Sequence, residues 1–465
     1  MTETGHRQPR IVMPLRRSAG AVSSREGATI EGGAALLAKV VLAGTLPLFA
    51  QIFYYLNEYP PPYLLSKAWP FLTLPLAFYG IARLKLPLRF LYLAVLAYVI
   101  GFTPLMSIIQ LGNDFIGALS TTIKAWPFSY YFSLSALLAL LSVPAHSVRK
   151  ICLGYGAATF ILMILIFLAA PTSWYGENPE DSKLLLYDLE RGYRVYMPMF
   201  FGMILLFWMG RSFVLKRNPV FLLGVLLAFV PLFLIYKQRT AIGAAALVVA
   251  YGMTMSLAPR VRRLVLGAGL VALAAGAIAI AAKSGLFSTV PKAVLADGLG
   301  DSLTVRSNSL RLAFGFLGDD PMRWLFGVGA TTRFSSTTIN DIFGNGQFYI
   351  SDLGWIGVLF EYGATGVLLL ASLHIWCFVM VFRFTDRSGD PFFLALSDYI
   401  LFIIASSSVY SVMFTPGELA VTTALAVYLH RRRNEPAPRR LAPKARVRLG
   451  KRPGSGAVVV HGRVG

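Results

Sequence analysis

The chain has 465 residues, of which 56% are apolar and 14% are charged, and its mean hydropathy is +0.63. Soluble globular proteins carry about 25% charged residues, so this composition excludes an ordinary soluble domain. A net charge of +21 suits either a nucleic-acid-binding protein or a membrane protein with basic cytoplasmic loops. The hydropathy favours the second class. We therefore expect an all-α, polytopic membrane helix bundle.

Residues 1–33 form a polar, basic stretch that carries five arginines before residue 26. The apolar run that follows begins too late and continues too long for the h-region of a cleaved signal peptide. We expect a cytoplasmic tail here, followed by about twelve transmembrane helices of roughly 20 residues each. The candidate spans are residues 34–56, 68–84, 90–111, 128–145, 151–171, 195–214, 219–236, 240–258, 264–282, 353–382, 391–413 and 418–430.

The basic clusters predict how these spans are oriented. One cluster follows each even-numbered span, as the positive-inside rule requires of cytoplasmic loops. The tail 431–465 adds eleven Lys/Arg against one Glu, a charge of +10. We expect both termini to be cytoplasmic in a bacterial inner (plasma) membrane. The C-terminal tail is expected to be disordered, and it either binds the anionic inner leaflet or docks a cytoplasmic partner.

On the opposite side two loops are long. Residues 172–194 are acidic and polar, and residues 283–352 are the longest stretch outside the predicted spans, which group as 34–282 and 353–430. Within the long loop we expect an amphipathic helix over Ser302–Leu317, lying on the membrane interface or capping the bundle. Transporters often show internal repeats, and this chain has none. The elaboration of one face favours chemistry or binding there.

Cations gather on this outer face. Lys237 and Arg239 stand in a turn without a carboxylate, which suggests an anionic partner such as a phosphate, because the planar fork of arginine donates bidentately. Two cations snorkelling at a helix boundary are the alternative. The outer loops also carry a set of arginines that either bind an anion or form a solvated basic face: Arg191, Arg194, Arg306, Arg311, Arg323 and Arg333.

An outer-face reaction has no histidine available as a base, because all five fall on or towards the predicted cytoplasmic side. The carboxylate candidates are Asp188, Glu190, Asp301, Asp341 and Asp352. Asp352 stands out because it ends the long loop where an apolar run begins, although a helix N-cap would suit it as well.

No Walker loop, HExxH motif or Cys/His cluster is present, so we expect no metal and no cofactor. Cys152 and Cys377 lie inside apolar runs and are expected to serve as packing residues. Within the spans, Asp398 and His374 are expected to form a structural pair in the inner half of the membrane.

The second half of the chain resembles the O-antigen ligase/polymerase superfamily, over roughly residues 220–380. Three places carry the likeness, in order around one outer loop. They are Lys237-Gln238-Arg239-Thr240; Arg311-Leu312-Ala313-Phe314 with Asp320-Pro321 and the segment Phe326-Gly327-Val328-Gly329; and Ser351-Asp352-Leu353-Gly354-Trp355 with Glu361-Tyr362-Gly363-Ala364-Thr365-Gly366.

The resemblance implies a metal-independent glycosyltransferase that acts on polyprenyl-diphosphate-linked oligosaccharides at the outer face. By this analogy Arg239 and Arg311 bind the diphosphate leaving group, assisted by Lys237 or Arg306, and fixed guanidinium groups stabilise the released charge. Arg191, Arg194 and Arg333 are further candidates for substrate binding. Chain-length regulators or export proteins are conceivable partners, and nucleic acid is not.

Ligases of this superfamily have a histidine in the closing motif of the loop, where this sequence has Ser351-Asp352. The difference favours a polymerase that builds an exopolysaccharide, capsule or O-antigen, with Asp352 as a hypothetical base for the acceptor hydroxyl. Three alternatives stay open: a ligase, a flippase or transporter of the lipid-linked repeat, and a structural membrane protein. A flippase should line its bundle interior with cations, whereas here they lie at the outer rim.

Overall fold

The computed structural model describes residues 25–177, 182–188, 191–269, 271, 306–332, 335–344, 348, 350–386, 389–413 and 415–434. Over these residues the chain is predominantly helical, with one two-stranded sheet. Four helical segments are long and apolar enough to cross a membrane: Arg89–Leu111, Ala145–Ala169, Pro219–Tyr236 and Trp355–Thr385. The helical class and the membrane character are therefore confirmed, while the count of twelve spans stays a prediction.

The first part of the chain consists of helices joined by short turns. They are α1 (Arg25–Phe49), η1 (Ile52–Tyr55), α2 (Pro60–Leu72), α3 (Leu74–Arg83), α4 (Arg89–Leu96), the π-helical η2 (Ala97–Phe102), α5 (Thr103–Leu111), α6 (Phe115–Ser120), η3 (Thr121–Lys124), η4 (Trp126–Ser129), α7 (Tyr130–Leu141) and α8 (Ala145–Ala169). The predicted span 68–84 is divided between α2 and α3, because the backbone leaves the helical region at Thr73 and Pro75 begins a new helix.

The second part begins with an irregular stretch and a hairpin. Its elements are η5 (Thr172–Trp174), β1 (Leu185–Asp188), β2 (Gly192–Val195), α9 (Phe200–Lys216), α10 (Pro219–Pro231), the π-helical η6 (Leu232–Tyr236), α11 (Arg239–Met255), helices at 259–269 and 306–317, α14 (Pro321–Phe326), α15 (Ile339–Phe343), η7 (Ile350–Leu353), α16 (Trp355–Asp386), α17 (Pro391–Ser406) and α18 (Pro416–Asn434). The predicted helix Ser302–Leu317 is confirmed over 306–317; its start and the proposed cap Asp301 lie outside the described residues.

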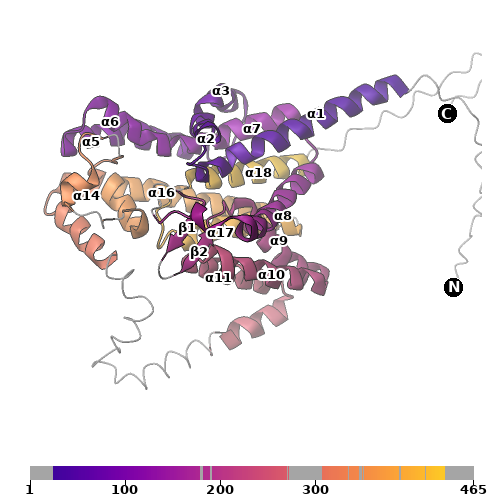
Figure 1. Cartoon of the computed structure of the whole chain (residues 1–465). Coiled ribbons are helices and arrows are strands. Elements are labelled where there is room, and N and C mark those ends of the chain that lie inside the picture. The colour runs from indigo at the N-terminus through magenta and orange to yellow at the C-terminus, as the bar shows by residue number, and fades with distance from the viewer. Residues whose placement is uncertain are drawn as a thin grey trace, which may run out of the picture.

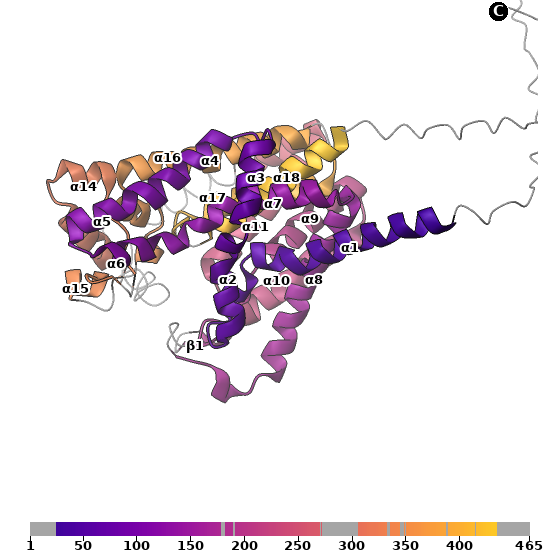
Figure 2. The ribbon, with the colours of Figure 1, turned by 90° about the horizontal axis from the view of Figure 1, so that it is seen from above.

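The bundle is built around α9 and α18. Helix α9 packs against α8, α10, α11 and α17, and α18 packs against α7 and α17 (Figure 1). Leu419 through Leu429 of α18 are buried, so this helix lies inside the bundle and not at its surface. At the end farthest from α1, α5 and α14 lie side by side (Figure 2).

The lipid-facing character of the surface is clearest on α10. Apolar side chains usually leave water when a protein folds, yet this helix exposes large ones along its length. They are Leu223, Leu226, Leu227 and Val230, and the following η6 continues the exposed face with Phe233 and Leu234. A membrane is the environment in which such a face is stable.

Two contacts join loops that follow even-numbered spans in the predicted order. Arg431, just after the last span, donates a hydrogen bond to the carbonyl of Lys85, which follows the second. Arg149, after the fourth, lies 3.6 Å from the carboxylate of Asp390, after the tenth. These contacts agree with the alternation of sides that the basic clusters predict.

The expected pair of Asp398 with His374 is wrong. Asp398 instead accepts two hydrogen bonds from Arg211, from Nε at 2.7 Å and Nη2 at 2.6 Å, and the Arg211 side chain is only 3% exposed. The charged, bidentate fork is a stronger partner for a carboxylate than a neutral imidazole. His374 bonds through Nδ1 to the carbonyl of Leu370 at 2.7 Å.

Helix α16 reverses its direction at Gly363, where the backbone has φ +65° and ψ −177°. A straight helix would separate Trp355 and His374 by about 28 Å, yet their ring centroids lie 5.9 Å apart. The segment before Gly363 therefore folds back on the one after it. The predicted tenth span, residues 353–382, is long enough to include a re-entrant or tilted piece, and the break at Gly363 falls within it.

The segment Gly327-Val328-Gly329 crosses α16 beside this reversal. The amide of Val328 donates to the carbonyl of Phe360 at 2.9 Å, and the amide of Gly329 to that of Glu361 at 3.1 Å. A Cβ on Gly327 would come within 2.5 Å of the Glu361 backbone. The two backbone segments can approach this closely because Gly327, at the point of crossing, has no side chain.

Candidate functional site

The hairpin β1–β2 presents two arginines around one carboxylate. Asp188 pairs with Gly192 and Leu186 with Arg194 across the antiparallel strands. The Asp188 carboxylate lies 3.5 Å from Arg194 Nη2 and 3.9 Å from Arg191 Nε. Both arginine side chains are mostly buried, with 23% of Arg191 and 14% of Arg194 exposed. The two guanidinium groups therefore share the Asp188 carboxylate.

Lys237 fastens this hairpin to the start of α11. Its ammonium donates to the carbonyls of Arg191 at 2.7 Å and Tyr193 at 3.0 Å. Next to it the Gln238 amide donates to the Tyr196 hydroxyl at 2.5 Å. These contacts give Lys237 a positioning role for Arg191.

Asp352 joins the hairpin to the long outer loop. It lies in η7 and interacts electrostatically with Arg306 and Arg191. Burial raises the pKa of the Asp352 carboxyl above its usual range, and the two guanidinium groups partly oppose that rise. Tyr196 in turn interacts with Arg194 and Asp352. We call Arg191, Arg194, Arg306 and Asp352 the arginine cluster.

The arginine cluster keeps hydrogen-bond donors for a further anion. Among the described residues, the Nε atoms of Arg191, Arg194 and Arg306 are buried and have no hydrogen-bond partner. Asp188 forms ion pairs with Arg191 and Arg194 but leaves these N–H groups without a hydrogen bond. A buried donor without a hydrogen bond is costly, and an oxyanion with several acceptor oxygens would satisfy such donors from more than one side. The cluster is therefore suited to a phosphate or diphosphate.

The helix at 306–317 holds Arg306 in place by capping the bundle. Ala313 and Leu317 on this helix are buried in a small apolar cluster that includes Val328 and Phe360. Arg323 secures the following turn through the carbonyl of Phe316 at 2.7 Å. Of the two placements considered for this helix, packing on the bundle is the one observed.

The other predicted cations that the structure describes are more exposed than the arginine cluster. Arg311 is exposed and donates to Asn308 at 3.1 Å; five residues beyond Arg306, it lies about 140° around the helix axis. Arg239 is exposed at the first residue of α11, next in the chain to the residues that hold the hairpin. Arg333 lies outside the described residues, as do the candidate bases Glu190 and Asp301.

Of the remaining candidate bases, Asp341 is a helix cap. It forms a capping box with Thr338 at the start of α15, and the hydrogen bonds from Thr338 lower the pKa of Asp341. A carboxylate stabilised in this way is a poor base.

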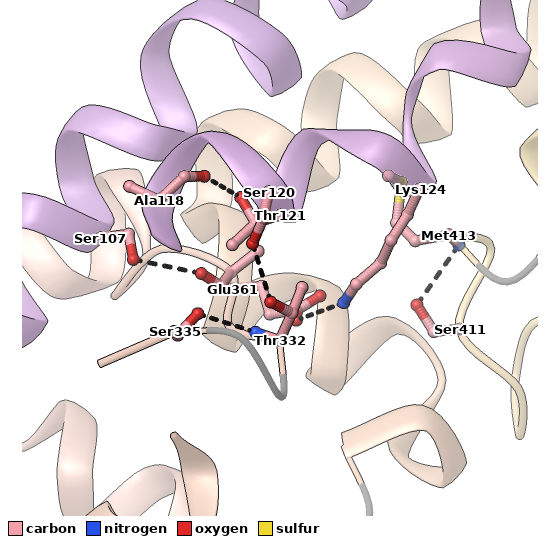
Figure 3. A network of polar contacts seen from close by, with 11 residues as sticks. Ser107, Ala118, Ser120, Thr121, Lys124, Thr332, Ser335, Glu361, Ser411 and Met413 are labelled. Atoms are coloured by element: carbon pink, nitrogen blue, oxygen red, sulfur yellow. Dashed lines mark hydrogen bonds and ion pairs between the residues drawn. The ribbon is translucent and has the colours of Figure 1, made fainter. Parts of the chain in front are cut away.

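A second charged pair lies at the reversal of α16. The Lys124 ammonium is 3.2 Å from Glu361 Oε1, with 5% of the Glu361 side chain and 35% of the Lys124 side chain exposed. A hydroxyl pair, Ser120 with Thr332 at 2.9 Å, lies nearby (Figure 3). In the sequence, Glu361 stands out only as the first residue of the motif Glu361–Gly366, and Lys124 belongs to no motif. The sequence signal for Glu361 is that it is a single carboxylate inside an apolar span.

Tyrosines connect the two charged groups. Tyr54 interacts electrostatically with Lys124. Its neighbour Tyr55 packs against Tyr196 with ring centroids 5.9 Å apart, and Tyr196 interacts electrostatically with Arg194 and Asp352. Two lysines lie over the Tyr54 ring, Lys183 at 4.0 Å and Lys67 at 4.3 Å from its centroid. Ring contacts and electrostatic interactions of these tyrosines thus link the arginine cluster with the Lys124–Glu361 pair, and we call this the polar region.

Among the described residues, no group of three His, Cys, Asp or Glu side chains could hold a metal ion. Both cysteines are free and buried, as expected. No protein-family model matches the sequence, and no curated protein is similar enough to count as a match.

Proposed function

We propose that the protein is a membrane glycosyltransferase that polymerises polyprenyl-diphosphate-linked oligosaccharide repeats into an extracellular polysaccharide. The observation that carries the proposal is the arginine cluster. Arg191 and Arg306 come from distant segments and both interact electrostatically with Asp352, and Arg194 lies beside Arg191 on the hairpin. The buried Nε atoms of all three arginines have no hydrogen-bond partner among the described residues.

The chemistry of the leaving group fits this arrangement. Breaking the bond between an anomeric carbon and a diphosphate releases negative charge on the phosphate oxygens. Fixed guanidinium groups in a partly buried site stabilise that charge without a metal, because they are oriented before the reaction begins. A lipid-linked donor also suits a site built on a membrane helix bundle.

The roles implied by the family resemblance are reassigned in part. We propose that Arg191, Arg194 and Arg306 hold the diphosphate, and that Lys237 positions Arg191 through its backbone carbonyl. Arg239 and Arg311, which the resemblance favours, are exposed and are assigned to the rim, where they attract the anionic substrate. We further propose twelve spans, cytoplasmic termini and an inner-membrane location.

A flippase is the weaker candidate from another class. It requires cations along the interior of the bundle to carry a diphosphate across. Arg211 is the buried arginine of α9, and its bidentate pair with Asp398 already neutralises it.

The test uses the purified protein in liposomes with a polyprenyl-diphosphate-linked oligosaccharide, with products resolved by gel. The wild type should give a ladder of multiples of the repeat. Arg306→Ala and Arg191→Ala should each lower the rate by about 10²–10³-fold, the cost of removing one preorganised donor. Arg239→Ala and Arg311→Ala should raise KM more than they lower kcat.

Arg260→Ala is the matched control, an exposed arginine outside the site that should leave the ladder intact. Substrate that crosses the bilayer without growing in length would identify a flippase. Transfer of a single glycan to another acceptor, with no ladder, would identify a ligase.

A further inference from the structure

The proposed function leaves open which group accepts the proton of the acceptor hydroxyl, and geometry restricts the answer. In a direct displacement at an anomeric carbon, the nucleophile and the leaving group lie on opposite sides of the sugar, so the base and the groups that bind the leaving group flank it. The base should therefore be separated from the arginine cluster.

Asp352 does not meet this requirement. It interacts electrostatically with Arg306 and Arg191, the cations assigned to the diphosphate. A carboxylate in that position lies on the leaving-group side of the sugar. Its negative charge would also compete with the phosphates for the same guanidinium groups.

Glu361 meets the requirement. It lies near one end of the helical segment that precedes Gly363, whereas Asp352 lies just before the other end. That segment of eight residues is about 12 Å long, so the two carboxylates lie at opposite ends of it. The polar region continues between the two carboxylates through Tyr196, Tyr55 and Tyr54.

Resting on the proposed function, we propose that Glu361 is the catalytic base and that the Lys124–Glu361 pair marks the acceptor end of the site. The acceptor hydroxyl oxygen forms a bond to the anomeric carbon of the donor, and its proton passes to the Glu361 carboxylate. The bond from the anomeric carbon to the phosphate oxygen breaks, and the diphosphate leaves with the electron pair, held by the arginine cluster. Glu361 then releases its proton to solvent.

Lys124 orients the base in this scheme. Its ammonium binds Oε1 of Glu361 at 3.2 Å and so fixes the orientation of a largely buried carboxylate. The amide of Gly329 holds the Glu361 backbone from the other side at 3.1 Å. The reversal at Gly363 thus serves to fix a carboxylate within reach of the tyrosine-lined region.

The experiment measures turnover and donor binding separately, with the full-length protein in liposomes. Glu361→Gln should lower kcat by at least about 100-fold, within the range for losing a general base, and its residual rate should not vary with pH. Binding of polyprenyl diphosphate without sugar should stay within about twofold of wild type, as should the thermal midpoint. Asp352→Asn should instead change the affinity for that ligand.

Two further variants distinguish catalysis from structure. Lys124→Met breaks the same ion pair but keeps the carboxylate, so a catalytic Glu361 predicts a smaller loss and a retained pH dependence, whereas a purely structural pair predicts equal losses in both variants. Glu361→Asp keeps the acid and should retain part of the rate.

Near-normal turnover by Glu361→Gln, or equal loss of folding and binding in Glu361→Gln and Glu361→Asp, would overturn the inference. In that case a wild type that still builds the ladder leaves the polymerase proposal intact. A wild type that builds none overturns both.

Discussion

In the proposed site, the Asp352 carboxylate would control anion binding without acting as the base. Burial favours its neutral form, and the guanidinium groups of Arg306 and Arg191 favour its charged form. The net result is a raised pKa. For the protein alone, a folded-state pKa above the unfolded value means that the stability contribution is present at low pH and is lost as pH rises through the folded pKa.

Like the stability, the affinity for an anionic ligand should be higher at low pH and fall as pH rises through the pKa of Asp352. Below its raised pKa Asp352 is neutral and leaves the arginines to the ligand; above it, the carboxylate repels the phosphates. We therefore expect Asp352→Asn to bind polyprenyl diphosphate about tenfold more tightly than wild type at neutral pH, as one unit of pKa coupling would give. The advantage should disappear as pH falls below the pKa of Asp352.

The measurement is the ratio of the two dissociation constants from pH 4 to pH 8, because the ionisation of the ligand itself cancels in the ratio. A ratio that stays constant over this range would show that Asp352 does not compete for the cluster.

At the scale of elements, the break in α16 organises the site. Gly363 has a backbone conformation that is essentially restricted to glycine. A Cβ there would also lie 2.4 Å from the Gly327 nitrogen and 2.5 Å from the carbonyl carbon of Leu325. Both the reversal and the crossing segment therefore depend on this residue.

Gly363→Ala should destabilise the fold through backbone strain and overpacking, each worth about 1–3 kcal/mol. It should also abolish polymer formation, because Glu361 loses its position. The check is the thermal midpoint in detergent together with the liposome assay. Gly154→Ala in α8 is the matched control, since nothing lies within 4 Å of its added Cβ. Equal midpoints for the two variants would contradict a structural role for the reversal.

Sequence patterns predicted the helices better than they predicted the site. Unpaired backbone is so costly in a bilayer that long apolar runs and basic loops give strong signals. The hairpin Leu185–Val195 was not predicted, because two strands of four residues in a polar loop carry no strong periodicity. The sequence does not indicate Arg211 as the partner of Asp398, because Arg211 stands close to Lys216 and Arg217 in a basic cluster. In the structure, α9 places the Arg211 side chain in the core.

The arginines of the site were predicted as a set but not as a cluster. Arg191 and Arg306 belong to loops that lie far apart in the chain, and only folding shows that both approach Asp352. Arg239 and Arg311, favoured by the family likeness, are the exposed ones. Local sequence does not determine which of several loop cations becomes buried.

At the scale of the whole molecule, the two ends of the helix bundle differ in the loops and charged residues that they contain. One end gathers the loops with basic clusters through contacts such as Arg431 with Lys85. The other holds the hairpin, the capping helix and the charged region around Lys124 and Asp352. A transferase that builds an extracellular polymer requires this second end to face outward.

The orientation can be measured with cysteines introduced at each end and a membrane-impermeant maleimide on intact cells. Asp319→Cys and Glu58→Cys lie at exposed positions of the site end, and Arg260→Cys lies at an exposed position of the other. We expect the first two to react in intact cells and the third only after permeabilisation. The native Cys152 and Cys377 are buried and should contribute little background, which the unmodified chain tests directly. The reverse pattern would place the arginine cluster on the cytoplasmic side, and a polymerase working on the outer face would then be excluded.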